Sequence, residues 1–276
     1  MEIEISGLLD KEYTVFNTKY YFDKEGKQGR DIDIHAMPLK DYGYEDLKPL
    51  HLRIDIAIEC KKSETHAWVF FTRPNKFLDA LDFSGQYKTS VPRVSTDSFE
   101  RLIRKCLKPH YRKFERIAIA YDEIKKEKDS SSRRDIFEAV HQLLKFTCYE
   151  IHESFIRRSK LTDLPLGHEL IFVFFPILVF DGDMFEVTFD SGKPRLNRRN
   201  HILVSTRYRC PYCQEVRSFI VDVVHRSYFS EFMKILDTDY YEMMKNILKN
   251  RYGLMKEAKE TRIKFLEKSV RFSVEK

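Results

Sequence analysis

The 276-residue sequence has no apolar run approaching the roughly 20 residues that a membrane-spanning helix needs. Its most apolar stretch, Leu170 to Phe180, is too short and is interrupted by Pro176. The first residues are acidic and lack the basic and apolar regions of a signal peptide. The five cysteines are odd in number and irregularly spaced, which argues against a disulfide framework. These absences predict a cytoplasmic protein without a membrane span.

An excess of either charge is also small. The chain has 49 basic and 43 acidic residues, a net charge of +6. This balance favours a polyanionic partner without demanding one, because an ordinary soluble protein with a slight lysine excess has the same charge. A hydrophobic content of 42%, with 22 Phe and 15 Tyr, is enough for a packed core and excludes a disordered chain.

Two apolar segments with the pattern of buried strands carry the most informative residues. The run 30–34 (RDIDI) is followed, after one connecting segment, by the run 54–58 (IDIAI), which ends in Glu59-Cys60-Lys61. Residues two apart share a face of a strand, so we expect Glu59 and Lys61 to project together and Cys60 to point away. Asp33 lies on a neighbouring predicted strand, so its carboxylate could meet that of Glu59, with the Lys61 ammonium group beside them. Mg²⁺ prefers such oxygen ligands.

The arrangement Asp33…Glu59-Cys60-Lys61 resembles the D…(D/E)-x-K core of the PD-(D/E)XK nuclease superfamily, which has the restriction-endonuclease-like fold. That fold opens with a helix that carries a glutamate, continues with a strand hairpin and then reaches the E-x-K strand. The motif is short and degenerate, so the resemblance depends on this order of elements.

The first seventy residues match the order of that fold. Met1 to Asp10 has apolar residues at helical spacing, and Glu4 matches the glutamate of the helix. Tyr13 to Asp23 and Arg30 to Met37 have the pattern of a hairpin around a short polar turn. The resemblance therefore implies an α/β protein with a mixed central sheet and flanking helices.

The resemblance also implies a role for each residue of the motif. Asp33 and Glu59 would bind Mg²⁺ or Mn²⁺ through carboxylate oxygens, and the main-chain carbonyl of Cys60 would add a ligand. Lys61 would act as a base toward water or stabilise charge on the phosphate. Glu4 would orient water or hold a second metal. Together these residues would serve the hydrolysis of a phosphodiester.

Plainer interpretations of the same residues remain open. Acidic residues on strands are usually solvated or paired with lysine, and a chance D…E-x-K is common in a sequence that is 33% charged. Asp31 competes with Asp33, since both lie on one strand face by parity. Asp33 is favoured because it lies deeper in the strand. A charge that ends a buried strand is costly unless it is paired or bound to metal, which favours a role for Glu59.

Apolar patterns predict further elements downstream. The predicted strands are 68–71, 117–121, 202–207 and 218–224, with a hairpin of 170–180 and 184–189 across Asp181-Gly182-Asp183; the predicted helices are 99–107, 135–159, 228–249 and a charged 255–268. The downstream order resembles that of uncharacterised bacterial proteins with the same nuclease-like core. We therefore expect one elaborated domain over residues 1–276, with the core at about 1–125 and a C-terminal α+β elaboration at about 135–276.

Several polar residues are candidates for contact with nucleic acid. The segment 193–199 (KPRLNRR) reads as a strongly basic loop suited to sequence-independent phosphate contacts. The candidates are Lys62, Lys193, Arg195, Arg198 and Arg199. Lys62 is equally explained as a surface lysine. Gln86 lies in an irregular segment and could reach nucleic acid, but the ordinary polarity of loops explains this residue equally well.

Cys210-Pro211-Tyr212-Cys213 is a lone C-x-x-C motif. A structural zinc needs four ligands, and no second pair of cysteines follows. His201 and His225 flank the motif at spacings that suit no standard zinc finger. A thioredoxin-like redox site is disfavoured because its C-x-x-C follows the first strand of a βαβ unit. We therefore expect a turn or a remnant zinc knuckle here.

The favoured interpretation is a metal-dependent nuclease acting on DNA, in restriction, defence or repair. One alternative is a protein of the same fold that binds nucleic acid or acts as a scaffold with little catalysis. Another is a protein-interaction module whose aromatic residues form a partner surface. The pattern predicts neither sequence preference nor endonuclease or exonuclease action. Cleavage of both DNA strands by a single-site fold would call for a homodimer.

Overall fold

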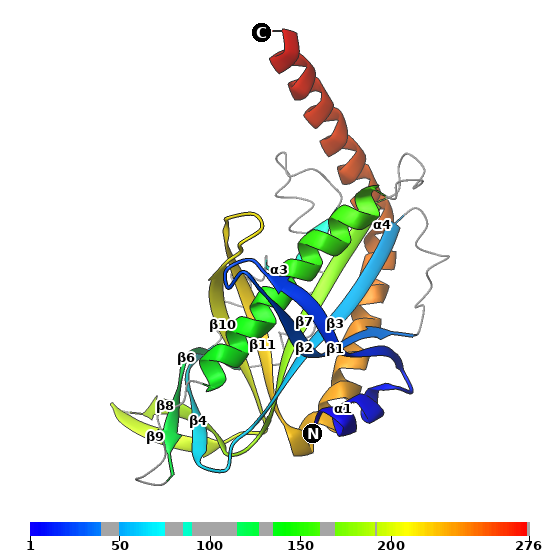
Figure 1. Ribbon diagram of the computed structural model, residues 1–276. Coiled ribbons are helices and arrows are strands. Elements are labelled where there is room, and N and C mark those ends of the chain that lie inside the picture. Colours follow the sequence, from blue (N-terminus) through cyan, green and yellow to red (C-terminus); the bar gives the residue numbers. More distant parts are fainter. Residues whose placement is uncertain are drawn as a thin grey trace.

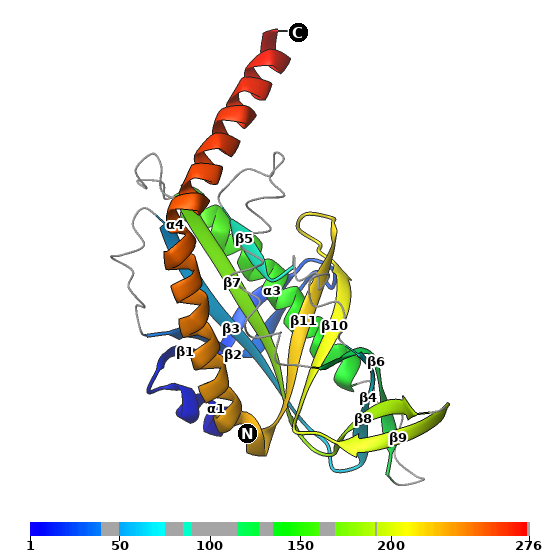
Figure 2. The same cartoon turned by 180° about the vertical axis from the view of Figure 1, so that it is seen from behind.

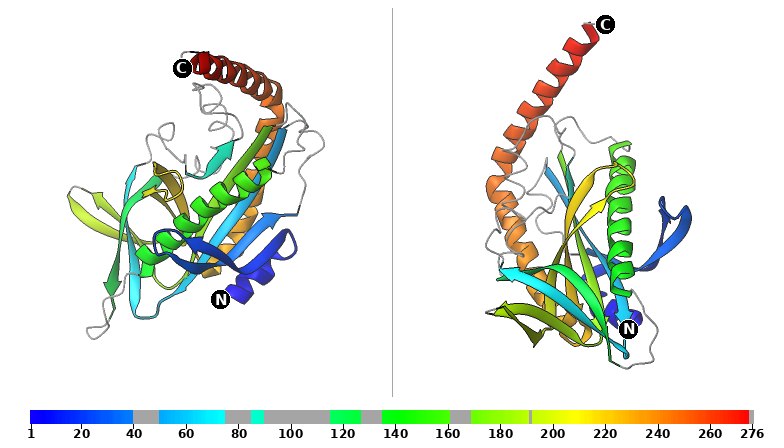
Figure 3. Two further views of the ribbon diagram at one scale, coloured as in Figure 1. Left: turned by 45° about the horizontal axis from the view of Figure 1, so that its top comes forward. Right: turned by 90° about the vertical axis from the view of Figure 1, so that its left-hand side faces the viewer.

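The computed structural model describes residues 1–39, 50–74, 85–89, 115–126, 135–160, 169–190 and 192–274. The helices are α1 (Glu2–Leu9), α3 (Asp135–Lys160), α4 (Phe229–Val274) and the short 3-10 helix η3 (Arg226–Tyr228). The strands are β1 (Tyr13–Asp23), β2 (Gln28–Pro38), β3 (Leu50–Lys62), β4 (His66–Pro74), β5 (Tyr87–Thr89), β6 (Arg116–Lys125), β7 (Glu169–Asp181), β8 (Met184–Asp190), β9 (Lys193–Arg198), β10 (His201–Arg209) and β11 (Val216–His225). Helix α3 covers one face of the sheet, and α1 and α4 lie on the other (Figures 1 and 3).

One mixed sheet joins all the described strands. Its order is β1-β2-β3-β7-β11-β10-β6-β4-β8-β9, and β5 pairs with β7. Four neighbouring pairs are parallel, namely β3 with β7, β7 with β11, β6 with β10 and β4 with β8. The chain is therefore an α/β protein with a mixed sheet and flanking helices. Strands β7, β11 and β10 lie between β3 and β6, so the predicted N-terminal core and C-terminal elaboration share one sheet.

Strands β3 and β7 form the centre of this architecture. They pair in parallel along their whole length, from Leu50 opposite Glu169 to Lys62 opposite Asp181. Every residue from Phe172 to Phe180 is buried. Continuous apolar runs of this kind are typical of parallel strands covered on both faces, because helices exclude water from each side.

Two apolar cores fill the space on either side of the sheet. Ile56 and Ile58 of β3 pack into the core beneath α1 and α4, whereas Ala57 packs into the core beneath α3. On α3, Ile136, Val140, Leu143 and Leu144 recur at helical spacing, and all are buried in the second core. Burying each side chain of this size contributes ~2 kcal/mol to folding. No helix in the described parts of the chain is long and apolar enough to cross a membrane.

Most of the predicted elements are confirmed. The first helix, the N-terminal hairpin and the long helix from Asp135 all lie within two residues of their expected bounds. The E-x-K strand is also present, but it begins at Leu50, four residues before the predicted run. The strands predicted at 68–71, 117–121, 202–207 and 218–224 are also present, each longer than expected. The helix predicted at 99–107 lies outside the described residues.

The hairpin predicted across Asp181-Gly182-Asp183 is wrong. Both strands exist, but β8 pairs in parallel with β4 and does not pair with β7. Near its end β7 already pairs with β3 on one side and with β11 on the other, so neither edge is free. The chain instead turns a corner beside the β3–β4 connection, where the Ser63 N–H donates to the Asp181 carbonyl at 3.1 Å. Gly182 is needed here because a Cβ atom would lie 2.7 Å from the Ser63 carbonyl oxygen.

Two other predictions near the C-terminus need correction. The basic segment 193–199 is not a loop, because Lys193–Arg198 forms β9, an exposed strand that pairs with β8. All six residues of β9 are exposed, so the strand has no buried face to produce an alternating pattern. The two predicted C-terminal helices are one helix, α4, which continues through Gly253 and extends past the sheet (Figure 2).

Helix α4 yields a direct test of this continuity. Gly253 is exposed inside the helix and has no left-handed backbone. An interior glycine costs about 1 kcal/mol relative to alanine. We expect Gly253→Ala to raise the free energy of unfolding by 0.5 to ~1 kcal/mol, measured by urea denaturation followed by circular dichroism.

The matched control is Gly192→Ala. Gly192 has a φ of +80°, which alanine adopts only with strain. We therefore expect the control to lower stability. A loss of stability in Gly253→Ala as well would contradict an unbroken helix, because it would indicate a glycine cap between two helices.

Candidate active site at the end of strand β3

The ladder between β2 and β3 stops where the predicted acidic residues begin. Its last pair is Ile34 opposite Ile58. Beyond this pair, the Cys60 N–H donates to the Oδ2 atom of Asp33 at 2.7 Å. A side chain thus takes the place of a main-chain acceptor, and Asp33 is held against the E-x-K segment.

Glu59 and Lys61 project from the same face of β3. Their side chains form an ion pair, with 2.7 Å between Lys61 Nζ and Glu59 Oε1. Cys60 faces the opposite core beneath α1 and α4. The expected alternation along the strand is therefore confirmed, and only the main chain of Cys60 can face the carboxylates. Glu59 is 1% exposed and Lys61 is 33% exposed, so the lysine reaches solvent and the glutamate does not.

Burial dominates the electrostatics of the two carboxylates. Burial raises the pKa of Glu59 from its ordinary value of 4.5 to about 7, and the nearby Asp33 adds to the rise. Burial likewise raises the pKa of Asp33, although the Cys60 N–H opposes this change. The Oε2 atom of Glu59 is buried and has no hydrogen-bond partner among the described residues. The site therefore holds negative charge that the protein compensates only in part.

Helix α1 contributes a carboxylate other than the expected one. The charge of Glu2 raises the pKa of both Asp33 and Glu59. Glu4 instead forms an ion pair with Arg226. Arg226 also binds Asp181 at 2.8 Å. Glu4 thus takes part in a neighbouring ion-pair network, and its proposed role toward water or metal stays a prediction.

Backbone strain lies directly across from Asp33. On β1, Thr18 has a φ of +52°, and the flanking pairs place it opposite Asp33 in the β1–β2 ladder. A left-handed conformation is a genuine outlier for a β-branched residue and costs ~1–3 kcal/mol. On β2, Ile32 and Ile34 are two residues apart but pack into different cores, so the alternation of this strand is interrupted at Asp33. The strained position thus coincides with the residue whose carboxylate turns toward Cys60.

Larger groups of metal-ligating side chains occur elsewhere in the structure. Among the described residues, two groups have three ligand atoms within 4.8 Å of one another, and neither contains Asp33 or Glu59. One group comprises His152, Cys210 and Cys213. The other comprises His35, Asp55 and Glu150 and is fully buried.

The buried group around Asp55 already has internal charge compensation. Arg53 makes two hydrogen bonds of 2.6 Å to the Asp55 carboxylate, and His35 contacts it at 3.2 Å. Lys19 lies 2.8 Å from Glu150 and 3.0 Å from the other ring nitrogen of His35. These ion pairs explain how the group is tolerated in the interior without a metal.

Most residues proposed to contact nucleic acid lie on the surface with acidic partners. Lys62 pairs with Glu64 at 2.7 Å. The four basic candidates in and beside β9 are all exposed, but Arg198 binds Asp183 at 2.8 Å and Arg199 binds the buried Glu186 at 2.7 Å. The net positive field of this segment is therefore smaller than its sequence suggests.

Gln86 has a structural role. Its side chain is 1% exposed, donates to the Phe174 carbonyl of β7 and accepts from the Ile220 N–H of β11. It thus bridges two strands, and the idea that it reaches nucleic acid is wrong.

The raised pKa of Glu59 predicts a pH-dependent change in stability. Without divalent metal, the carboxylate must ionise inside the folded protein as the pH rises from 4.5 through about 7, so stability falls over that range. One pKa unit corresponds to about 1.4 kcal/mol, which gives a cost of ~3 kcal/mol at about pH 8. Glutamine avoids this cost, and the pKa of about 7 already includes the favourable ion pair with Lys61. We expect Glu59→Gln to stabilise the metal-free protein by ~3 kcal/mol at about pH 8.

That advantage should shrink as the pH falls to about 5, where the folded wild type is protonated at Glu59. Guanidinium denaturation at both pH values measures it. Glu64→Gln is the matched control, because Glu64 is exposed and should change stability little. A loss of stability in Glu59→Gln at the higher pH would show that the Lys61 pair outweighs the burial of charge.

Comparison of the chain with protein-family models, with curated proteins and with solved structures found no match. The geometry of the site therefore carries the argument about function.

Proposed function

We propose that this protein is a metal-dependent nuclease that hydrolyses phosphodiester bonds, with DNA as the favoured substrate. One observation carries the proposal. One oxygen atom of the desolvated Glu59 carboxylate has no hydrogen-bond partner in the part of the chain that the structure describes, and Asp33 and Lys61 lie beside this carboxylate. A buried anion is costly unless a cation compensates it, and Lys61 engages only one of the two Glu59 oxygens among the described residues.

The donor atoms fit a hard divalent cation. Mg²⁺ is usually held by one or two carboxylates and retains water or phosphate oxygens as its other ligands. Asp33 and Glu59 supply two carboxylates, and the main-chain carbonyl of Cys60 is a further oxygen donor at the same end of β3. When bound, Mg²⁺ or Mn²⁺ would polarise a phosphoryl oxygen and lower the pKa of a water molecule.

Lys61 has the position and charge to act on a phosphate. Burial opposes its ammonium form, but the adjacent Glu59 outweighs this effect and the pKa of Lys61 rises. Lys61 therefore stays protonated and favours stabilisation of phosphate charge over action as a base. Its partial exposure allows the ammonium to contact a substrate that binds at the end of the strand.

The order of elements supports a restriction-endonuclease-like fold for this site. Helix α1, the β1–β2 hairpin and β3 follow one another, and β3 ends in the E-x-K segment. Asp33 lies on the strand next to β3. This is the order that the resemblance implies, and the opening helix carries Glu2, whose charge acts on Asp33 and Glu59, and Glu4, which pairs with Arg226.

The alternative is a protein of this fold that binds or organises nucleic acid without cutting it. The 2.7 Å ion pair between Lys61 and Glu59 favours this alternative, because it compensates part of the charge without metal. The two functions differ in whether metal binding at Glu59 leads to cleavage.

Cleavage of plasmid and single-stranded DNA with Mg²⁺ or Mn²⁺ tests the proposal. We expect wild-type protein to cut, and Glu59→Ala and Lys61→Ala to lower the rate at least about 100-fold, as loss of a charge-stabilising group does in other sites. Glu64→Gln and Lys126→Ala are matched surface controls that should cut at the wild-type rate. Equal cutting by Glu59→Ala would place any activity elsewhere.

Metal binding can be measured without catalysis. We expect Mg²⁺ to raise the thermal unfolding midpoint of the wild type more at about pH 8 than at about pH 6, because the cation must displace the Glu59 proton. Glu59→Gln should lose this shift. A metal shift and DNA binding in a mobility assay, without cutting, would support the scaffold function. No metal shift and no cutting would overturn the nuclease proposal.

A further inference from the structure

The lone C-x-x-C motif lies at the tip of the β10–β11 hairpin, directly against α3. Cys210 and Cys213 flank the tight turn between these two strands. Helix α3 carries Cys148 and His152, which are four residues apart and thus lie on one face of the helix. Two ligand pairs from separate elements therefore approach each other.

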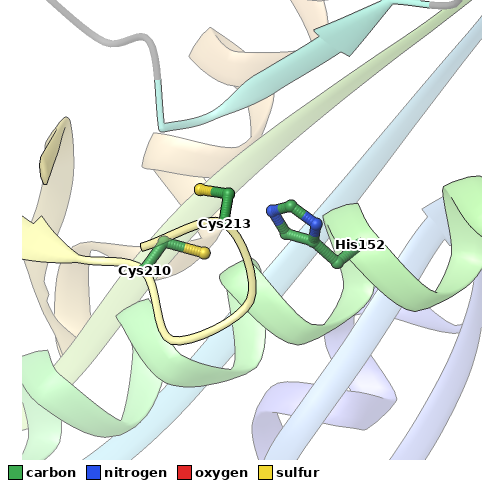
Figure 4. A group of neighbouring side chains, drawn as sticks. All are labelled: His152, Cys210 and Cys213. Carbon is green, nitrogen blue, oxygen red and sulfur yellow. The ribbon is translucent and has the colours of Figure 1, made fainter. Parts of the chain in front are cut away.

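Three of the four side chains have ligand atoms close enough to share one ion, and Cys148 lies beside one of them. The ligand atoms of His152, Cys210 and Cys213 all lie within 4.8 Å of one another. The imidazole of His152 points from α3 toward the two cysteines of the turn (Figure 4). The Cys148 thiol donates a hydrogen bond to Cys210, which places a third sulfur next to the group. Two sulfurs and one ring nitrogen thus converge on one point, and a third sulfur lies beside the Cys210 sulfur.

His152 provides an observation independent of the cysteines. Its side chain is 8% exposed, and its Nε2 atom is buried without a hydrogen-bond partner among the described residues. A buried ring nitrogen usually has a partner. Cys148 and Cys210 are also buried, and Cys213 is half-buried. The imidazole contacts the Cys210 sulfur, and Nε2 has no other partner among the described residues, so a metal ion at this point would satisfy the ring nitrogen.

The turn holds its sulfurs in the way that a metal-binding turn requires. The N–H groups of Tyr212 and Cys213 donate to the Cys210 sulfur, and the N–H of Glu215 donates to the Cys213 sulfur. These hydrogen bonds help to lower the pKa of the Cys210 thiol, whereas burial keeps the pKa of the Cys213 thiol above its ordinary value, so a bound cation would be needed to hold Cys213 as the thiolate that binds metal. Gln214 adopts a φ of +58° to make the turn, a strained conformation for a residue with a side chain.

A buried cation compensates the charge of the cluster. Arg217 is 7% exposed, and the charges of Cys213 and Cys210 raise its pKa. Three thiolates and a neutral imidazole around a divalent cation would carry a net charge of −1. The Arg217 guanidinium, which also pairs with the half-exposed Glu215 at 3.1 Å, offsets part of that charge, so a metal complex of this composition fits its surroundings.

We propose that Cys148, His152, Cys210 and Cys213 bind one structural Zn²⁺ ion. Three cysteines and one histidine form a standard closed tetrahedral zinc set. Soft thiolates with an imidazole select zinc over the hard cations expected at Asp33 and Glu59. All four ligands come from the protein, so the site lacks the open position of a catalytic zinc. The ion would fasten the C-terminal half of α3 to the β10–β11 turn.

The first experiment measures metal in the wild-type protein as purified without chelators. We expect about one zinc per chain by mass spectrometry of the metal. A mercurial reagent that captures thiols should release the zinc, and Co²⁺ in its place should give the visible and near-ultraviolet bands of a tetrahedral thiolate complex. This experiment requires no variant to fold.

Variants then assign the ligands. We expect Cys213→Ser and His152→Ala to lower zinc affinity about tenfold or more. The thermal unfolding midpoint of each should fall to that of the chelated wild type. His152→Cys should retain zinc, because four cysteines are an equally standard set. His225→Ala is the matched control and should keep full zinc content, since His225 bonds to Ser227.

Several results would overturn the proposal. Wild-type protein with no bound zinc and freely titrating thiols would do so, as would a disulfide between any two of these cysteines in the protein as purified. Iron with acid-labile sulfide would replace the zinc site with a cluster. Full zinc content in Cys213→Ser would place the ion elsewhere. None of these results depends on nuclease activity.

Discussion

The parallel pairing of β3 with β7 is the constraint on which the other features depend. It runs from Leu50 opposite Glu169 to Lys62 opposite Asp181, and each strand has another strand on its far side. Because helices cover both faces of the sheet, the central parts of these two strands are buried from solvent. The pairing also fixes where β3 ends, and this end carries Glu59 and Lys61. The position of the candidate site is thus a consequence of how the central strands pack.

The same burial that stabilises the sheet destabilises the ionised site. Glu59 follows directly on a buried apolar run, so its carboxylate loses water when the core forms. Asp33 lies on the neighbouring strand and adds negative charge. Lys61 compensates one carboxylate oxygen of Glu59, and the strained Thr18 lies across from Asp33. Burial of the ionised Glu59 carboxylate therefore lowers the stability of the metal-free fold, and strained backbone lies next to it. Such local losses of stability are expected at sites that are selected for binding rather than for stability.

The sequence could predict those features that depend on residues close to one another along the chain. Alternation placed Glu59 and Lys61 on one face of a strand, and turn residues placed the first hairpin. Sequence-based prediction failed where a feature depended on contacts between distant segments. The β7–β8 hairpin does not form because other strands occupy both edges of β7. The coupling of Glu2 to the site depends on how α1 docks, which helical spacing does not specify. The sequence places Cys148 and His152 inside a predicted helix, and only the tertiary structure brings them to the C-x-x-C turn.

Helix α3 connects the two candidate metal sites. Its start lies near the first, where the charge of Asp135 acts on Lys61 and the Glu123 carboxylate accepts the Ile136 N–H at 2.6 Å. Its second half carries two of the zinc ligands, roughly 20–25 Å further along the axis at 1.5 Å per residue. A helix fixed at both ends holds its apolar face in one register on the sheet, and this face covers the side of β3 from which Glu59 projects. Zinc would therefore act on the first site by positioning, since it determines how firmly α3 excludes water from the Glu59 carboxylate.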